Sequence, residues 1–293
     1  MMSDFVGYCT LNVNDSALVV TFPVLVFYPT NTPGQVEKLG SYPMDVALNA
    51  PLKAGTFPLI LISHGTGGTP LVYRNLAYYL ALHGFVVGLP EHPFNNRDND
   101  AWAGTMQNLA ARPRHLQLTI NHIFDDPRFA PALKPNMVGL IGHSLGGYTA
   151  LALAGGQPMV GPPHTPDGQW HAVPVPAPDS RVAALVLLAP AVPWYIPDGT
   201  LRQVQLPILL LVGDKDDHTP PPHAEIVLHG VPDLGKVQHR VVANAGHFSF
   251  LSPFPKARVS PAFPPSQDPP GFDRELFHEE LNAEVLAFLR REV

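Results

Sequence analysis

Three side chains that together could carry out nucleophilic catalysis follow three separate apolar runs of this sequence: Ser144, Asp216 and His247. A serine hydroxyl is a poor nucleophile at neutral pH. It needs a base to accept its proton, and a histidine base needs an acid to orient it. A fold that brings the ends of these apolar runs together would therefore assemble a nucleophile, a base and an acid.

Ser144 lies in Gly-His-Ser-Leu-Gly, between an apolar run and an alanine- and leucine-rich run, which predicts a strand, a sharp turn and a helix. In this context G-x-S-x-G is a nucleophile elbow. Gly142 and Gly146 lack a Cβ where the strand and helix backbones must pass close together. The helix N-terminus would favour a negative charge that develops beside the serine. The alternative is a glycine-rich turn that contains a serine by coincidence.

The predicted elements around this turn indicate an α/β fold. Strands are expected at 57–63, 85–90, 137–143, 182–189, 207–213 and 236–242, and helices near 73–80, 112–124, 145–154, 222–229 and 273–291. This alternation predicts a mostly parallel central sheet with helices on both faces. Before it, 5–13 and 18–28 are predicted as an antiparallel edge pair, and 29–55 as a loop. No linker separates two cores, so we expect one domain over residues 1–293.

Proline-rich or irregular stretches interrupt this pattern at about 91–111, 155–180 and 252–271. Proline does not continue helix interiors or central strands, and 35 of the 293 residues are proline. Long loops are often lids, so we expect these insertions to form a partial lid and the walls of an apolar pocket. The candidate pocket residues are His92, Phe94, Trp102, Trp170, Trp194 and Phe248. The alternative for each aromatic residue is packing against the core without contact to a ligand.

The acid and the base both have competitors. Asp214, Asp216 and Asp217 all follow the predicted strand 207–213, and the spacing alone does not choose among them. Together with His218 they could bind a metal, but loops for hard cations have a longer ligand spacing and a terminal acid, so no metal is predicted. His247 follows the last predicted strand in a short loop, which is a suitable position for the base.

Acyl transfer also requires donors for the oxyanion of the tetrahedral intermediate, usually two backbone N–H groups. We expect them from Leu145, which follows the serine, and from Thr66 in the glycine-rich stretch 64–68. A phosphate-binding loop would also join a strand, a glycine-rich turn and a helix. However, the sequence contains neither G-x-G-x-x-G nor G-x-x-x-x-G-K-[ST], and no cofactor is predicted.

Composition excludes several classes of protein. Hydrophobic residues make up 45% of the chain and charged residues 14%, which argues for a folded core and against disorder. A formal net charge of -6 argues against nucleic acid as a partner. The single cysteine, Cys9, excludes an internal disulfide. No apolar run approaches the roughly 18 residues of a membrane span, and the first residues do not resemble a signal peptide, so we expect a cytoplasmic location.

Six segments together resemble the dienelactone-hydrolase-like branch of the α/β-hydrolases, which includes esterases of the platelet-activating-factor acetylhydrolase type. They are 57–65, 82–87, 112–113, 142–147, 213–220 and 246–247. The resemblance extends from about residue 6 to the C-terminus and implies the α/β-hydrolase fold. It also assigns the acid to Asp216, because in many of these enzymes the acid is the third residue after the glycine that Gly213 matches.

The sequence departs from this branch at three positions. Dienelactone hydrolases use a cysteine nucleophile, whereas this chain has Ser144. The acetylhydrolases have their acid after the sixth strand, where this chain has no acid at 189–191. The branch often continues Arg-Pro-x-Asp, but here Arg112 and Pro113 are followed by Arg114 and His115, so an ion pair of that aspartate is lost.

The hypothesis that fits these residues best is a serine carboxylesterase that acts on small or medium apolar acyl or aryl esters. An amidase or peptidase with the same three side chains is the alternative, because sequence does not show how strongly a leaving nitrogen is protonated. A non-catalytic ligand-binding protein of this fold is a more remote alternative.

Overall fold

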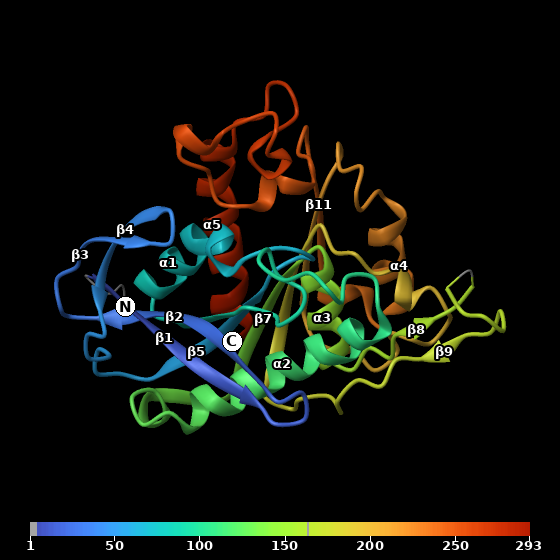
Figure 1. Ribbon diagram of the computed structural model, residues 1–293, viewed down its shortest axis with the longest axis horizontal. Helices are drawn as coiled ribbons and strands as arrows, with labels where there is room; N and C mark the ends of the chain where they lie inside the picture. The colour runs from blue at the N-terminus through green and yellow to red at the C-terminus, as the bar shows by residue number, and fades with distance from the viewer. Residues whose placement is uncertain (1–4, 163) are drawn as a thin grey trace.

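A ten-stranded sheet is the centre of the computed structural model, which describes residues 5–162 and 164–293 (Figure 1). The strand order is β12-β11-β10-β7-β5-β6-β2-β1-β4-β3. Its parallel part consists of β5 (Phe57–Ser63), β6 (Val86–Pro90), β7 (Leu133–His143), β10 (Val182–Leu188), β11 (Ile208–Gly213) and β12 (Val237–Val242). Because parallel strands run in one direction, the loops after their carboxyl ends meet at one edge of the sheet.

The N-terminal strands extend the sheet further than the sequence predicted. β1 (Phe5–Asp15) and β2 (Val20–Thr30) form the expected antiparallel pair. The expected loop 29–55 instead contains the hairpin of β3 (Gln35–Leu39) and β4 (Tyr42–Leu48), so that prediction is wrong. The hairpin also makes β1 and β2 interior strands and not the expected edge pair, and β3 lies at this edge of the sheet. Both strands are short and partly exposed, and they turn at Gly40, whose φ is 59°. Their sequences therefore lack the continuous apolar character of the buried strands.

Helices cover both faces of the sheet. α2 (Met106–Asp125), α3 (Leu145–Leu153) and α4 (Pro222–Gly230) pack on one face, and α1 (Arg74–Leu82) and α5 (Arg274–Glu292) on the other. Along β5, Leu59 and Leu61 join the first core, and Ile60 and Ile62 join the second. Successive side chains of a strand point to opposite faces, so burial of both faces explains why β5 is apolar throughout.

Helix α2 begins earlier than predicted and continues through Pro113. Thr105 caps its N-terminus by accepting a hydrogen bond from the Asn108 N–H at 3.2 Å. A proline inside a helix removes one backbone donor and leaves the carbonyl four residues earlier without its partner. Here the Tyr148 hydroxyl donates to that carbonyl, of Leu109, at 3.0 Å. This tertiary contact explains why residues 106–111 are helical rather than part of the expected insertion.

The other two predicted insertions are largely irregular. Residues 155–180 contain only the two-residue strands β8 (Met159–Val160) and β9 (His171–Ala172) among the part that is described. Residues 252–271 contain short 3-10 turns at Lys256–Arg258 and Pro264–Ser266 and lie at the top of the view in Figure 1. Arg274 fixes this segment to α5 through Asp268 at 2.9 Å. No helix in 5–162 or 164–293 combines the length and apolarity needed to cross a membrane.

Candidate active site

Ser144 lies on a strained turn between β7 and α3. Its φ of 53° and ψ of -123° are uncommon for a residue with a side chain. The turn is held by the Ser144 N–H, which donates to the Leu188 carbonyl at 3.1 Å. A Cβ on Gly146 would lie 2.0 Å from the Ser63 carbonyl oxygen, and one on Gly142 would lie 2.1 Å from that of Gly146. The glycines are therefore required by the close approach of β5, β7 and α3.

Asp216 and His247, which are 31 residues apart, come together after β11 and β12. The Nδ1 of His247 is 2.9 Å from the Asp216 Oδ2, and both side chains are almost fully buried. The Nε2 of His247 has no hydrogen-bond partner among the described residues. This nitrogen is thus available to accept a proton.

Thr219, which the sequence analysis did not single out, fixes the Asp216 carboxylate. Its N–H donates to Oδ1 at 2.8 Å, and its hydroxyl donates to Oδ2 at 2.7 Å. Burial alone would raise the pKa of Asp216, but the hydrogen bonds from His247 and Thr219 outweigh it and lower that pKa well below its usual range. The spacing of three residues between an aspartate and a threonine in a turn was the available sequence signal.

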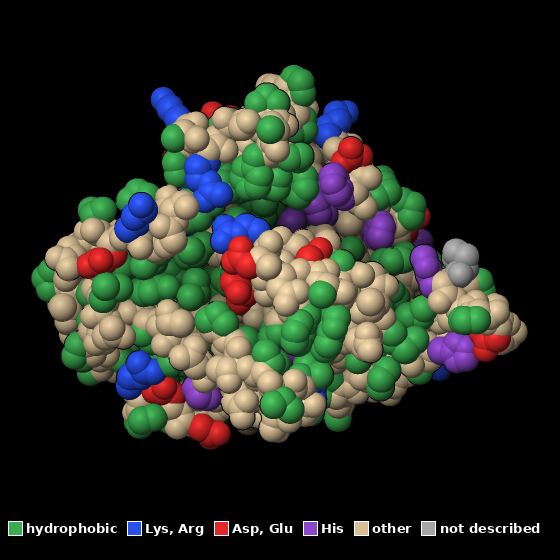
Figure 2. Space-filling view, in the orientation of Figure 1, with side chains coloured by type: hydrophobic (Ala, Val, Ile, Leu, Met, Phe, Trp, Pro, Cys, Tyr) green, Lys and Arg blue, Asp and Glu red, His purple; other side chains and the backbone are tan. Residues whose placement is uncertain are grey.

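Two aromatic side chains hold the His247 ring. The His218 ring stacks on it with centroids 4.8 Å apart and an angle of 12°, and Phe248 meets it edge-on at 5.3 Å. The His218 side chain is about half exposed, at 52%. Histidine side chains gather on this face of the molecule, between the positions of β11 and α4 (Figure 2). The His247 ring is thus restrained in its plane before any substrate binds.

His143 connects the serine turn, the base and the loop after β5. Its Nε2 donates to the His247 carbonyl at 2.9 Å, and its Nδ1 accepts from the Tyr73 hydroxyl at 2.9 Å. The Tyr73 oxygen in turn accepts from the Gly65 N–H at 3.4 Å. Burial is the main cause that lowers the pKa of His143 to about 3. His143 is therefore a neutral residue that links these three segments.

Thr66 and Leu145, the predicted oxyanion donors, line one cavity together with Ser144. Neither backbone N–H donates to another residue in the described part of the chain. The cavity has a volume of about 180 Å³ and a mostly apolar wall. Its other lining residues are Gly104, Thr105, Asn108, Leu109, Ala191 and Trp194.

The predicted pocket residues do not line one common cavity but lie in separate parts of the structure. Trp194 lines the cavity beside Ser144, and Phe248 contacts the ring of His247. The Phe94 ring packs against the Trp102 ring at an angle of 31°, with centroids 4.4 Å apart, and Trp102 lines a separate surface groove near Arg114. Trp170 packs over Gly161 and is 41% exposed.

His92 does not occupy the pocket wall that the sequence suggested. It is fully buried, and its Nε2 lies 2.9 Å from the Ser63 hydroxyl. Its N–H donates to the His64 Nε2 at 3.0 Å. The strand β6 ends two residues earlier, so the chain is still inside the core at this point.

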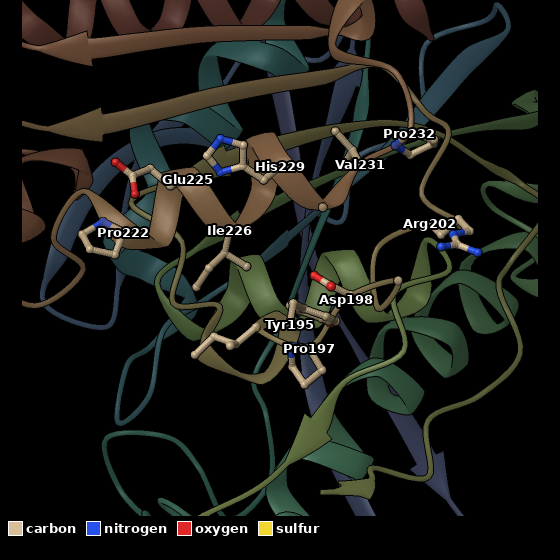
Figure 3. Close-up of a pocket in the computed structure, with 13 residues that line it drawn as sticks. Tyr195, Pro197, Asp198, Arg202, Pro222, Glu225, Ile226, His229, Val231 and Pro232 are labelled. Carbon is tan, nitrogen blue, oxygen red and sulfur yellow. The ribbon is translucent and has the colours of Figure 1, made fainter.

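A larger surface pocket, of about 700 Å³, lies between α4 and the 3-10 turn Pro193–Tyr195 (Figure 3). Glu225 and His229 extend from α4, and Ile226 lies between that helix and Tyr195. Ser144 and His247 do not line this pocket. Its volume is therefore not part of the space in which Ser144 could react.

Asp216, Asp217 and His218 place possible ligand atoms within 4.8 Å of one another. These atoms already have partners within the chain. Asp216 accepts from Thr219 and contacts His247, and the Nδ1 of His218 lies 2.7 Å from Asp217. The cluster is thus explained by the hydrogen bonds that hold the aspartate and the histidines.

Five buried histidines predict that this fold loses stability in mild acid. Burial lowers the pKa of His64, His115 and His143 to about 3 and that of His278 to about 4, and it also lowers the pKa of His92. The unfolded chain takes up these protons at a higher pH. The free energy of unfolding should therefore fall below about pH 6.5, by up to about 1.4 kcal/mol per pH unit for each histidine.

Urea unfolding at a series of pH values measures this effect. The His278→Gln variant keeps a donor for the Ser249 carbonyl, which the His278 Nε2 now contacts at 3.1 Å. In this variant, the number of protons taken up on unfolding should fall by up to one, so the free energy of unfolding should depend less steeply on pH. A urea midpoint that stays constant between about pH 7 and about pH 5 would contradict the prediction.

The chlorophyllase family model matches residues 26–160 of this chain. This match includes Thr66 and Ser144 and ends before Asp216 and His247. Platelet-activating factor acetylhydrolase of Cavia porcellus is 28% identical over 161 residues, which cover 40% of this chain and 37% of that protein. Chlorophyllase type 0 of Chenopodium album is 29% identical over 138 residues, which cover 44% and 38%. The matches thus span less than two fifths of the length of these curated relatives.

The solved structure of ferulic acid esterase from Streptomyces cinnamoneus superposes with a TM-score of 0.70 at 17% identity. The superposition covers 98% of this chain and 90% of that one. The chain is therefore an α/β-hydrolase in fold, as its parallel sheet and serine turn indicated. The sequence matches confirm the resemblance to the acetylhydrolase type and add chlorophyllase to it.

Proposed function

We propose that this chain is a serine carboxylesterase in which Ser144, His247 and Asp216 form the catalytic triad. The observation that carries the proposal is the buried His247–Asp216 pair, at 2.9 Å, after the strands that follow the serine turn. The Nε2 of His247 and the N–H groups of Thr66 and Leu145, which have no partner among the residues that the structure describes, support the same assignment. The names of the relatives, an acetylhydrolase and chlorophyllases, also support ester hydrolysis.

In the acylation step, the Ser144 oxygen attacks the ester carbonyl carbon, and its proton passes to the Nε2 of His247. The carbonyl oxygen becomes an oxyanion that accepts hydrogen bonds from the N–H groups of Thr66 and Leu145. The Asp216 carboxylate accepts a hydrogen bond from the Nδ1–H of His247 and stabilises the imidazolium. The C–O bond of the ester then breaks, and His247 returns the proton to the leaving alcohol.

In the deacylation step, a water molecule attacks the acyl carbon of the acyl-enzyme. Its proton passes to His247, and the second oxyanion binds at the same N–H groups. When the bond to the Ser144 oxygen breaks, that oxygen takes the proton from His247. The carboxylic acid leaves and the free enzyme is restored.

The cavity beside Ser144 favours a short apolar acyl group. Its volume of about 180 Å³ is below the roughly 300–1,000 Å³ that is typical of sites for larger ligands. Leu109, Ala191 and Trp194 contribute apolar wall. The acetyl group that the acetylhydrolase relative is named for agrees with this size.

A series of p-nitrophenyl esters tests the acyl preference. We expect kcat/KM to rise from acetate to butyrate by about fourfold per methylene, since each buried methylene contributes about 0.8 kcal/mol, and to fall for laurate. Trp194→Ala should move the optimum to longer chains. A wild-type preference for laurate would contradict the proposed cavity.

The matching p-nitroanilides test the amidase alternative, and faster turnover of an anilide than of its ester would overturn the esterase proposal.

A further inference from the structure

Arg112, on α2, is fully buried and directs its guanidinium at four neutral acceptors. Its Nε donates to the Thr149 hydroxyl at 3.0 Å, and one terminal nitrogen donates to the Asn95 Oδ1 at 2.6 Å. The other terminal nitrogen donates to the His64 carbonyl and, at 3.4 Å, to the Ser63 hydroxyl. These four bonds engage at most four of its five N–H donors, and an arginine is rarely buried to this extent without a paired acid.

No carboxylate forms an ion pair with Arg112 among the described residues. His115 occupies the place where the sequence pattern would have an aspartate, and the nearby Asp15 pairs with Arg114 instead, at 2.6 Å. Burial lowers the pKa of Arg112, but only to about 9, so the side chain remains a cation at neutral pH. The hydrogen bonds of Arg112 lead to the Asp100 carboxylate only through Asn95, whose Nδ2 donates to Asp100 at 2.6 Å.

One of the Arg112 contacts leads to the first turn of helix α3, which contains the first oxyanion donor, Leu145. The Thr149 hydroxyl, which accepts from Arg112, donates to the Leu145 carbonyl at 2.9 Å. Arg112 thus determines where Thr149 directs its proton. Thr149 holds the Leu145 carbonyl, in the peptide that follows the one with the donor N–H.

The other contacts lead to the second donor, Thr66. The Asn95 amide, whose oxygen accepts from Arg112, donates through Nδ2 to the Thr66 hydroxyl at 2.8 Å. The His64 carbonyl accepts directly from Arg112 two residues before Thr66. One guanidinium therefore bridges the two separate segments that supply the N–H groups.

The histidines around Arg112 do not add to its charge. Burial, reinforced by the positive charge of Arg112, lowers the pKa of His64 and His115 to about 3, and lowers that of His92. These rings are neutral at the pH at which an esterase works. Arg112 is thus the source of positive charge within this network.

We propose that Arg112 is a positioning residue of the oxyanion hole. It holds the two segments that contain the N–H groups of Thr66 and Leu145, and its positive charge, which no carboxylate contacts directly among the described residues, stabilises the tetrahedral oxyanion. Donors that are fixed before the reaction stabilise charge without reorganisation, and a low-dielectric interior strengthens the effect. This inference rests on the proposed esterase function and adds to it a residue that is remote from the substrate.

The Arg112→Met variant tests the proposal with p-nitrophenyl butyrate and with a boronic acid that forms a tetrahedral adduct on serine. We expect kcat to fall by about a hundredfold or more, the range seen when one oxyanion donor is removed, with KM changed far less. Affinity for the boronic acid should fall in parallel with kcat. Arg112→Lys restores the charge but not the bridge, so its kcat should lie between those of Arg112→Met and the wild type.

Leu116→Ala is the matched control, because Leu116 is a fully buried apolar residue one turn along the same helix. It should lower the Tm without changing kcat or boronic acid affinity. If Leu116→Ala reproduces the kinetic loss of Arg112→Met, or if Arg112→Met keeps the wild-type kcat, the proposal is overturned.

Thr149→Val provides a test that does not depend on the folding of Arg112→Met. It removes the hydroxyl link to Leu145 with almost no change in volume. We expect about a tenfold loss of kcat at constant KM, and wild-type kcat in this variant would overturn the proposed linkage. A wild-type protein that hydrolyses no ester and forms no serine adduct would instead refute the proposed function, which is a distinguishable result.

Discussion

Ser144→Ala is expected to lower kcat for p-nitrophenyl butyrate by about a millionfold, the loss seen when a triad serine is removed. Without its oxygen no acyl-enzyme can form, and the remaining groups can only bind the ester and polarise its carbonyl. The variant should also lose covalent labelling by a fluorophosphonate. Its fold should be retained, because alanine keeps the Cβ at a φ of 53° and Ser144 donates its backbone N–H, not its side chain, to Leu188.

Ser180→Ala is the matched control, since Ser180 is exposed and lies outside the site. It should retain wild-type turnover and labelling. Substantial ester hydrolysis by purified Ser144→Ala, with the kinetics of the wild type, would show that another group is the nucleophile. Labelling that persists in this variant would point to the same conclusion.

Asp216→Asn is the second change with a very large expected effect, a loss of about ten-thousandfold in kcat. An asparagine amide can donate to the Nδ1 of His247, which would place the imidazole proton on Nε2 and prevent that atom from accepting the serine proton. The hydrogen bonds that hold Asp216 lower its pKa far below its usual range. Its ionisation should therefore not produce the acid limb of the wild-type pH–rate profile.

Asp214→Asn and Asp217→Asn are the controls for Asp216, because both neighbours are exposed and neither contacts His247. They should change kcat by less than about twofold, as expected for surface carboxylates. If Asp217→Asn removed activity and Asp216→Asn did not, the acid would be assigned to the wrong residue. The comparison thus tests the choice among three aspartates that spacing alone left open.

Much of the parallel sheet could be predicted from the sequence, and the hairpin could not. β5, β6, β10 and β11 are buried on both faces, so they are continuous apolar runs that periodicity detects. β3 and β4 lie at the edge with many exposed side chains, and they are held by pairing, of β4 with β1 and of β3 with β4, which composition does not reveal. Likewise, α2 continues through Pro113 because Tyr148 satisfies the carbonyl that proline leaves free.

The sequence by itself determined the serine turn and the order of the candidate site residues. Gly142 and Gly146 could be recognised because a turn that packs a strand, a helix and β5 together excludes a Cβ at both positions. The motif itself is local, since its five residues are consecutive, although the group that a Cβ on Gly146 would meet is Ser63 of β5.

Only the tertiary structure decided which groups hold the serine turn, the base and the acid in place. Thr219 and His218 restrain His247 and Asp216, and His92 lies in the core rather than at the pocket wall. Arg112 bridges two loops that are distant in the sequence. A hydrogen bond depends on distance and angle in space, so partners that are tens of residues apart leave no periodic signal in the chain.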